Sequence, residues 1–260
     1  MARIGILQAP ASSGKEQARK AVVEVLTKSR VEADIIVMPE YLMMDPTGLG
    51  PKELASIAEP LDGPWVRWIE GLSREYGACI VASMFERGDG KPYNTVIVAR
   101  DGELVYSYRK THLFDALGYK ESTVFNRGEE PPGTVDCGMK IGTIVCFEIR
   151  FPELTRRLVL EGAEVIVVPA AWYRGDGKEE ALRFLAQARA HENTVYVTVS
   201  ALYGDRFTGR SMLINPMGIV VQDLGHGVRY VEADVDRGEI SEARHRLPLL
   251  RLRRRELYTI

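Results

Sequence analysis

Residues 142–154 read GTIVCFEIRFPEL and place Cys146 at the end of an apolar run. The run from Ile141 to Val145 predicts a buried strand, and the Pro-Glu-Leu sequence at 152–154 predicts a helix that starts soon after it. A cysteine at such a junction sits on a sharp turn that exposes its sulfur, and a helix N-terminus favours its thiolate. The stretch therefore predicts the strand–helix unit of an α/β fold, with Cys146 in a nucleophile's position.

Two other segments carry what a nucleophile would need. Residues 34–40 read DIIVMPE, so Glu40 directly follows a second apolar run. Residues 108–114 read YRKTHLF and contain Lys110. Taken singly, these residues have ordinary explanations, because core cysteines are commonly inert and most glutamates and lysines are solvated. Their joint occurrence in one chain is what indicates chemistry.

Together the three segments resemble the nitrilase superfamily of carbon–nitrogen hydrolases. The sequence after the cysteine is similar to its amidase-like branch, which includes ω-amidase and deaminated-glutathione amidase. In this superfamily a glutamate, a lysine and a cysteine act in that chain order, which here is Glu40, Lys110 and Cys146. The resemblance runs along nearly the whole chain, from the QAP sequence at 8–10 to the arginines at 253–254.

The resemblance implies roles for five residues. Cys146 would attack the carbonyl carbon of a small carboxamide and form a thioester, which water then hydrolyses. Glu40 would be the general base, and partial burial would raise its pKa toward a useful value. Lys110 and the backbone N–H of Phe147 would stabilise the tetrahedral intermediate. Glu121 matches the second glutamate of the family, which orients the lysine and assists proton transfer.

The hydrophobic pattern agrees with the fold that the resemblance implies, a four-layer α-β-β-α sandwich. Strand and helix patterns alternate, but mid-chain hairpins and a strand-rich last third favour two sheets packed face to face over one doubly wound sheet. We expect strands at 4–7, 35–38, 78–84, 95–100, 103–108, 165–168, 195–200, 211–215, 219–222 and 228–233, and helices at 14–30, 64–76 and 178–192.

The bulk properties exclude several classes of protein. The chain has 260 residues, 45% hydrophobic and 27% charged, and a net charge of −2, so we expect no nucleic-acid partner. No signal peptide or membrane span is apparent, and Cys79 and Cys137 are expected to be inert, so we expect a cytoplasmic protein. We expect one domain over 1–260 with no metal or cofactor. The resemblance implies a homodimer or larger homo-oligomer, with 246–260 as a tail at the dimer interface.

Two alternative functions stay open. Phe147 and Glu148 depart from the Cys-Tyr-Asp of the amidase-like branch, which leaves open a nitrilase that converts a nitrile to acid and ammonia through a thioimidate. A non-catalytic binding protein that kept the fold is the alternative from another class. A Cys–His pair with His112 would give protease-like chemistry, but the resemblance implies a structural histidine there.

The substrate pocket is expected to be lined by aromatic side chains, namely Phe114, Phe147, Trp172 and Tyr173. For Trp172 and Tyr173, simple packing under a loop is an equally good explanation. Arg150 could bind a substrate carboxylate, but a structural ion pair with Glu148 or Glu153 is at least as good an explanation.

Overall fold

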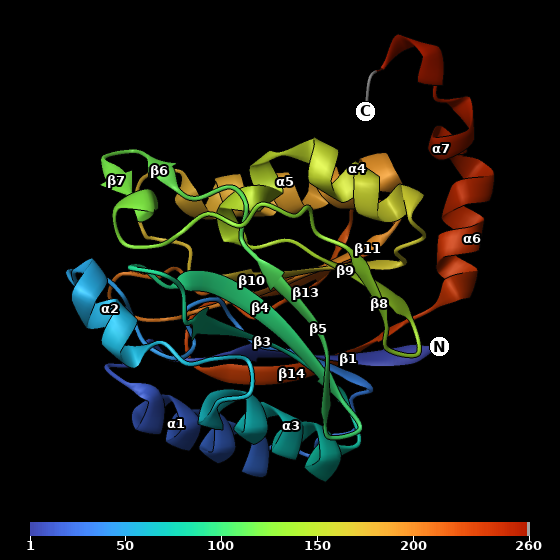
Figure 1. The fold of residues 1–260 in the computed structure, drawn as a ribbon. Coiled ribbons are helices and arrows are strands. Elements are labelled where there is room, and N and C mark those ends of the chain that lie inside the picture. Colours follow the sequence, from blue (N-terminus) through green and yellow to red (C-terminus); the bar gives the residue numbers. More distant parts are fainter. Residues whose placement is uncertain (259–260) are drawn as a thin grey trace.

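The computed structural model describes residues 1–258 and contains two six-stranded sheets packed face to face (Figure 1). The first sheet has the order β14 (Arg229–Val235), β1 (Ala2–Gln8), β2 (Ile35–Val37), β3 (Cys79–Glu86), β4 (Tyr93–Arg100) and β5 (Glu103–Arg109). The second has the order β13 (Val220–Asp223), β12 (Met212–Ile214), β11 (Tyr196–Ala201), β10 (Val165–Ala170), β9 (Lys140–Thr143) and β8 (Thr134–Asp136).

Helices cover both outer faces of this pair of sheets (Figure 1). The first sheet is covered by α1 (Lys15–Thr27) and α3 (Pro64–Tyr76), and the second by α4 (Pro152–Leu160) and α5 (Lys178–Asn193). The predicted α-β-β-α sandwich is therefore confirmed. No helix within residues 1–258 combines the length and the apolar character needed to cross a membrane.

The remaining helices, turns and strands complete the chain. They are α2 (Pro51–Ile57), the two-stranded sheet of β6 (Asp115–Ala116) and β7 (Tyr119–Lys120), the 3₁₀ turns η1 (Glu121–Thr123), η2 (Cys146–Arg150) and η3 (Arg255–Leu257), and α6 (Arg237–Arg246) and α7 (Leu249–Leu252). Helix α6 was not predicted, because its sequence is highly charged and it buries just Ile240 and Ala243.

The core follows from the two-residue period of the strands. In β2, Ile35 and Val37 belong to the apolar cluster between the sheets, whereas Ile36 belongs to the cluster under α1 and α3. Successive side chains of a strand point to opposite faces, so a strand buried on both faces reads as a continuous apolar run. This is why the sequence showed an uninterrupted run there rather than an alternating pattern.

The directions of the strands bring the C-terminal ends of strands that are distant in sequence to the same end of each sheet. The first sheet pairs β1, β2 and β3 in parallel, and β5 runs in the same direction because two antiparallel pairings separate it from β3. The second sheet pairs β9, β10 and β11 in parallel. The C-terminal ends of β2 and β5 therefore lie at the same end of the first sheet. The C-terminal ends of β9 and β10 likewise lie at the same end of the second sheet.

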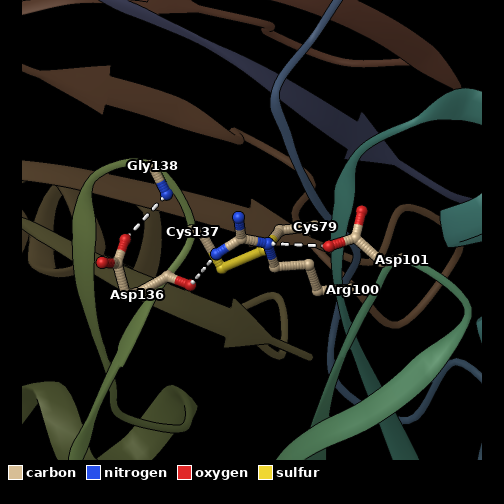
Figure 2. The surroundings of a disulfide bond; sticks show 6 residues. All are labelled: Cys79, Arg100, Asp101, Asp136, Cys137 and Gly138. Atoms are coloured by element: carbon tan, nitrogen blue, oxygen red, sulfur yellow. Dashed lines mark hydrogen bonds and ion pairs between the residues drawn. A yellow bond between two sulfur atoms is a disulfide. The ribbon is translucent and has the colours of Figure 1, made fainter.

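A disulfide joins the two sheets at the other end of these strands (Figure 2). Cys79 is the first residue of β3, Cys137 lies in the turn between β8 and β9, and their Cα atoms are 5.8 Å apart. Arg100 donates to the carbonyl oxygen of Asp136 at 3.0 Å and so holds this turn against the first sheet. The expectation that Cys79 and Cys137 are inert is wrong, because the fold brings together two cysteines that are 58 residues apart in sequence.

We expect the Cys79→Ser/Cys137→Ser double variant to be less stable than the native protein. A bridge across 58 residues restricts the unfolded chain, which corresponds to about 4 kcal/mol in the loop-entropy estimate. Urea unfolding of both proteins, each with and without dithiothreitol, measures the difference. Dithiothreitol should destabilise the native protein and leave the double variant unchanged; equal midpoints for all four samples would contradict the prediction.

Candidate active site

A buried lysine lies between two buried carboxylates at the end of the sheet where β2 and β5 terminate. The Nζ atom of Lys110 is 2.9 Å from Glu40 and 2.8 Å from Glu121. Lys110 directly follows β5, Glu40 follows β2, and Glu121 begins η1. All three side chains are at most 1% exposed. Three predicted site residues from distant segments are thus in direct contact.

Neutral hydrogen-bond donors complete this cluster. The side-chain amide of Asn94 donates to Glu40 at 2.7 Å and to Glu121 at 3.0 Å. The Tyr41 hydroxyl donates to Glu121 at 2.8 Å, and the backbone N–H of Ala171 donates to Glu40 at 2.9 Å. Asn94 and Tyr41 were not predicted as site residues. A polar residue inside the buried strand β4 was the available signal for Asn94.

The pKa values of Glu40 and Lys110 are both raised, but for different physical reasons. Burial raises the pKa of the Glu40 carboxyl, although Lys110 opposes this shift. Burial alone would lower the pKa of the Lys110 ammonium, but the charges of Glu121 and Glu40 hold it well above its usual range. Lys110 is therefore a fixed cation, and Glu40 is a carboxylate with an increased affinity for a proton.

Cys146 stands at the start of η2 in a left-handed conformation, with φ of 46°. It is the free cysteine among the described residues, and it is buried. Burial and the charge of Glu40 raise the pKa of its thiol well above the usual range, although Lys110 acts in the opposite direction. Burial and the Glu40 charge therefore outweigh the stabilisation of the thiolate that was expected from the helix N-terminus. The sulfur can become a nucleophile if a base such as the adjacent Glu40 takes its proton.

Glu148 connects the cysteine turn to the lysine segment. One carboxylate oxygen accepts from Tyr108 at 2.7 Å and from the N–H groups of Thr111 and His112 at 2.9 and 3.1 Å. The other oxygen accepts from the N–H of Val145 at 2.8 Å. Burial alone would raise the pKa of Glu148, but hydrogen bonds from His112 and Tyr108 hold it below its usual range.

This arrangement bears on two open alternatives. The ring of His112 packs against Phe151 with 4.2 Å between centroids, and its Nδ1 lies 3.8 Å from Glu148, which agrees with a structural rather than a catalytic role. The Glu148 carboxylate already accepts hydrogen bonds from N–H groups of the lysine segment. Within the described chain, Arg150 forms no ion pair with Glu148 or Glu153. Arg150 instead lies over the Trp172 ring at 4.2 Å.

Three of the predicted pocket residues form one aromatic group, which includes Phe147, the residue after Cys146. Phe114 contacts the rings of Phe147 and Tyr173, with centroids 5.0 and 6.5 Å apart, and Tyr119 lies 5.7 Å from Tyr173. Trp172 is buried and joins this group through Arg150, which lies 5.2 Å from the Phe147 ring. These side chains form one aromatic wall, which we define as Phe114, Phe147, Trp172 and Tyr173.

The geometry agrees with comparisons to known proteins. A family model described as carbon-nitrogen hydrolase matches residues 3–245. The chain belongs to the carbon-nitrogen hydrolase family. Its relatives include a 2-oxoglutaramate amidase from Bacillus subtilis, 30% identical and covering 98% of each chain. They also include a deaminated glutathione amidase from Bos taurus, 32% identical over 98% of this chain and 83% of that protein.

Solved structures support the fold of this carbon-nitrogen hydrolase. The carbon-nitrogen hydrolase from Helicobacter pylori superposes with a TM-score of 0.89 at 21% identity, covering 99% of this chain and 97% of that one.

Within residues 1–258, no three side chains of His, Cys, Asp or Glu are grouped so that they could hold a metal ion.

We expect Glu148→Gln to weaken the folded state, because a glutamine amide faces N–H donors that need an acceptor. The cost should be about 2–3 kcal/mol at pH 7. The folded pKa of Glu148 lies below the ordinary glutamate value of about 4.3. The stabilisation by Glu148 is therefore fully present above that value and is lost as pH falls through the folded pKa.

Urea unfolding at pH 7 and near pH 3.5 tests this expectation. The difference between the native protein and Glu148→Gln should be smaller at the lower pH. Glu153→Gln, an exposed glutamate close by in sequence, is the matched control and should change stability by less than about 0.5 kcal/mol. A Glu148→Gln variant as stable as this control would show that Glu148 does not hold the two segments together.

Proposed function

We propose that this protein is a thiol amidohydrolase that cleaves a small carboxamide into a carboxylic acid and ammonia. The observation that carries the proposal is the buried contact of Lys110 with Glu40 and Glu121, next to the Cys146 thiol. A binding protein that kept the fold would have no need of a buried ammonium between two carboxylates, since such a group is costly to desolvate. Relatives named as amidases support the same conclusion.

The first half of the proposed reaction forms a thioester. Glu40 takes the proton from the Cys146 thiol as the sulfur attacks the amide carbon, and a C–S bond forms while the carbonyl π bond opens to an oxyanion. Lys110 and the backbone N–H of Phe147 stabilise that oxyanion. The oxyanion then re-forms the carbonyl and breaks the C–N bond, and the leaving nitrogen takes the proton from Glu40, which releases ammonia.

The second half returns the enzyme to its starting state. Glu40 takes a proton from water as the water oxygen attacks the thioester carbon. The new tetrahedral intermediate expels the Cys146 sulfur, which recovers the proton from Glu40, and the carboxylic acid leaves. Glu121 holds Lys110 in place throughout. No step requires a redox change, and the balance is amide plus water to acid plus ammonia.

The nitrile alternative has lost its main support. It rested on Phe147 and Glu148, which depart from the amidase-like pattern. Glu148 is accounted for by its hydrogen bonds to the lysine segment, so its identity carries no argument about the substrate. The relatives named above are amidases rather than nitrilases.

We also propose the organisation of the enzyme in solution. It would act as one domain over 1–260 and as a homodimer, with the tail 246–260 at the interface; residues 259 and 260 lie outside the described residues. The exposed apolar residues Leu252 and Leu257 support this role of the tail. A cytoplasmic location would suit a nucleophile that must stay reduced, whereas the Cys79–Cys137 bridge argues against it, because disulfides are rare in cytosolic proteins outside hyperthermophiles.

We expect ammonia release from short aliphatic amides, ω-amido acids, aromatic amides or N-carbamoyl amino acids, measured beside the matching nitriles. Cys146→Ala should reduce turnover by about 10³-fold or more, because it removes the nucleophile. The Cys79→Ser/Cys137→Ser variant is the matched cysteine control and should stay active below its melting temperature. Cys146→Ala with native activity would refute the amidase proposal, and turnover of nitriles alone would favour a nitrilase.

We expect the activity to rise with pH through the ionisation of Glu40. The reaction needs Glu40 as a carboxylate, and burial raises its pKa. The acidic limb of the kcat/KM profile should therefore have its midpoint above about 4.3, the ordinary value for glutamate. Initial rates between pH 4 and pH 9 measure it, and a midpoint below about 4 would contradict a buried Glu40 base.

A further inference from the structure

The Glu121 carboxylate is filled with hydrogen-bond donors. Its Oε1 atom accepts from the Tyr41 hydroxyl at 2.8 Å and from the Asn94 amide at 3.0 Å. Its Oε2 atom accepts from the Lys110 ammonium at 2.8 Å and from the backbone N–H of Phe114 at 2.7 Å. A carboxylate offers about four lone-pair sites, two on each oxygen. These donors therefore occupy all of the sites of Glu121 and leave none for a proton.

The Glu40 carboxylate, in contrast, has one site left. Its Oε1 atom accepts from the Asn94 amide at 2.7 Å and from Lys110 at 2.9 Å, so that oxygen is filled. Its Oε2 atom accepts from the backbone N–H of Ala171 at 2.9 Å, and its second lone pair is free. The Cys146 thiol is a hydrogen-bond partner of Glu40. The free lone pair on Oε2 is therefore the place where the thiol proton can go.

Asn94 is the neutral side chain that the two carboxylates share. Its amide nitrogen carries two hydrogens, and it donates one to Oε1 of Glu40 and the other to Oε1 of Glu121. Its backbone carbonyl oxygen accepts from the backbone N–H of Lys110 at 2.9 Å. Asn94 lies in strand β4 and is 1% exposed. One residue on a rigid strand thus contacts every charged member of the cluster.

Packing alone does not explain an asparagine at this position. Within residues 1–258, the Oδ1 atom of Asn94 is buried and has no hydrogen-bond partner. A buried acceptor without a partner destabilises the folded state, and an apolar side chain of the same size would avoid that cost. The opposite orientation of the amide would place Oδ1 against two carboxylates. The two hydrogen bonds that Asn94 donates therefore account for its presence and for its orientation.

The titratable groups that face Glu40 leave it as the group that exchanges a proton. They are Lys110, Glu121, Cys146, Tyr41, Tyr119 and Tyr173. Burial raises the pKa of all three tyrosine hydroxyls, which therefore stay neutral. The two carboxylate charges hold the pKa of Lys110 well above its usual range, so it stays a cation. The free lone pair separates Glu40 from Glu121.

We propose that Asn94 is a positioning residue that directs the thiol proton to Oε2 of Glu40 and keeps Glu121 a carboxylate throughout the reaction. The proposal rests on the amidase function proposed above and specifies the path of its proton. The S–H bond of Cys146 breaks, an O–H bond forms at Oε2 of Glu40, and the same proton then passes to the leaving nitrogen. Glu121 neither gains nor loses a proton in either half of the reaction.

The Asn94→Leu variant tests the proposal, because leucine has a similar size and no N–H donor. Glu40 would lose a hydrogen bond that favours its ionised form, whereas Glu121 would keep the donors Tyr41, Lys110 and Phe114. The midpoint of the acidic limb of kcat/KM should therefore rise by about one pH unit or more. Initial rates are measured with the amide that the native protein hydrolyses fastest.

Asn215→Leu is the matched control. Asn215 is also a buried asparagine whose amide donates to a carboxylate, that of Glu239 at 2.8 Å. It directly follows β12, whose last residue pairs with Val197 near the start of β11. It therefore lies at the opposite end of the second sheet from the end of β10. Asn215→Leu can cost stability but should leave the midpoint of the acidic limb unchanged.

Alkylation of Cys146 by iodoacetamide gives the same midpoint without any amide turnover. Its rate needs the thiol proton to leave for Glu40, so it should fall at low pH with the ionisation of Glu40. Asn94→Leu should raise this midpoint by the same amount as the midpoint of kcat/KM. Asn94→Ser is a second variant, in case a lowered melting temperature shows that Asn94→Leu folds poorly. Its side chain is too short to bridge the two carboxylates, so its midpoint should rise as well.

The outcomes separate this proposal from the amidase function. A raised alkylation midpoint in the Asn94 variants, without ammonia release by the native protein, would support the role of Asn94 and refute the function. Ammonia release by the native protein, with equal midpoints in the native protein and a folded Asn94 variant, would support the function and overturn the proposal. An equal rise in Asn215→Leu would also overturn it, because the shift would then follow from lost stability.

Discussion

The contact on which the rest of the structure depends is the buried ion cluster of Glu40, Lys110 and Glu121. Removing an ion from water costs several kcal/mol, and an ion pair in the interior persists if good geometry and additional hydrogen bonds offset that cost. Asn94 and Tyr41 supply such hydrogen bonds. The cluster keeps one fixed positive charge where an oxyanion can form. The same burial that makes the cluster costly also raises the pKa of Glu40 and makes it a stronger base.

The architecture provides this cluster through strand direction. The base and the lysine come from the ends of two strands in one sheet, and the nucleophile comes from the other sheet. Contact across the two sheets is direct, because the N–H that follows β10 donates to Glu40. Glu148 adds a second connection between the cysteine turn and the lysine segment. The relative position of sulfur, base and cation is thus fixed by packed sheets and not by mobile loops.

The sequence allowed the layers and the central residues to be predicted, but not their supporting contacts. Apolar runs that end in Glu40 and Cys146 are visible as local patterns. A polar residue in a buried strand was a local signal for Asn94, but the contacts that Asn94 and Tyr41 make across the fold are not visible in any local pattern. The burial and the Glu40 charge that oppose ionisation of Cys146, and outweigh the nearby helix N-terminus, arise from contacts of the folded chain. The pair of Cys79 and Cys137 was missed for the same reason, since the proximity of residues far apart in sequence exists in the folded chain alone.

The short strand β9 has a consequence for the sulfur chemistry of the chain. It lies between Cys137, which is oxidised, and Cys146, which must stay a free thiol. Its four residues span about 13 Å at the usual rise of a strand, beyond the roughly 7 Å over which two cysteines can be bridged. These two cysteines are close in sequence, so in the unfolded chain they could form a non-native disulfide with each other. Once β9 forms, it acts as a spacer, so folding itself selects which sulfur is left free to react.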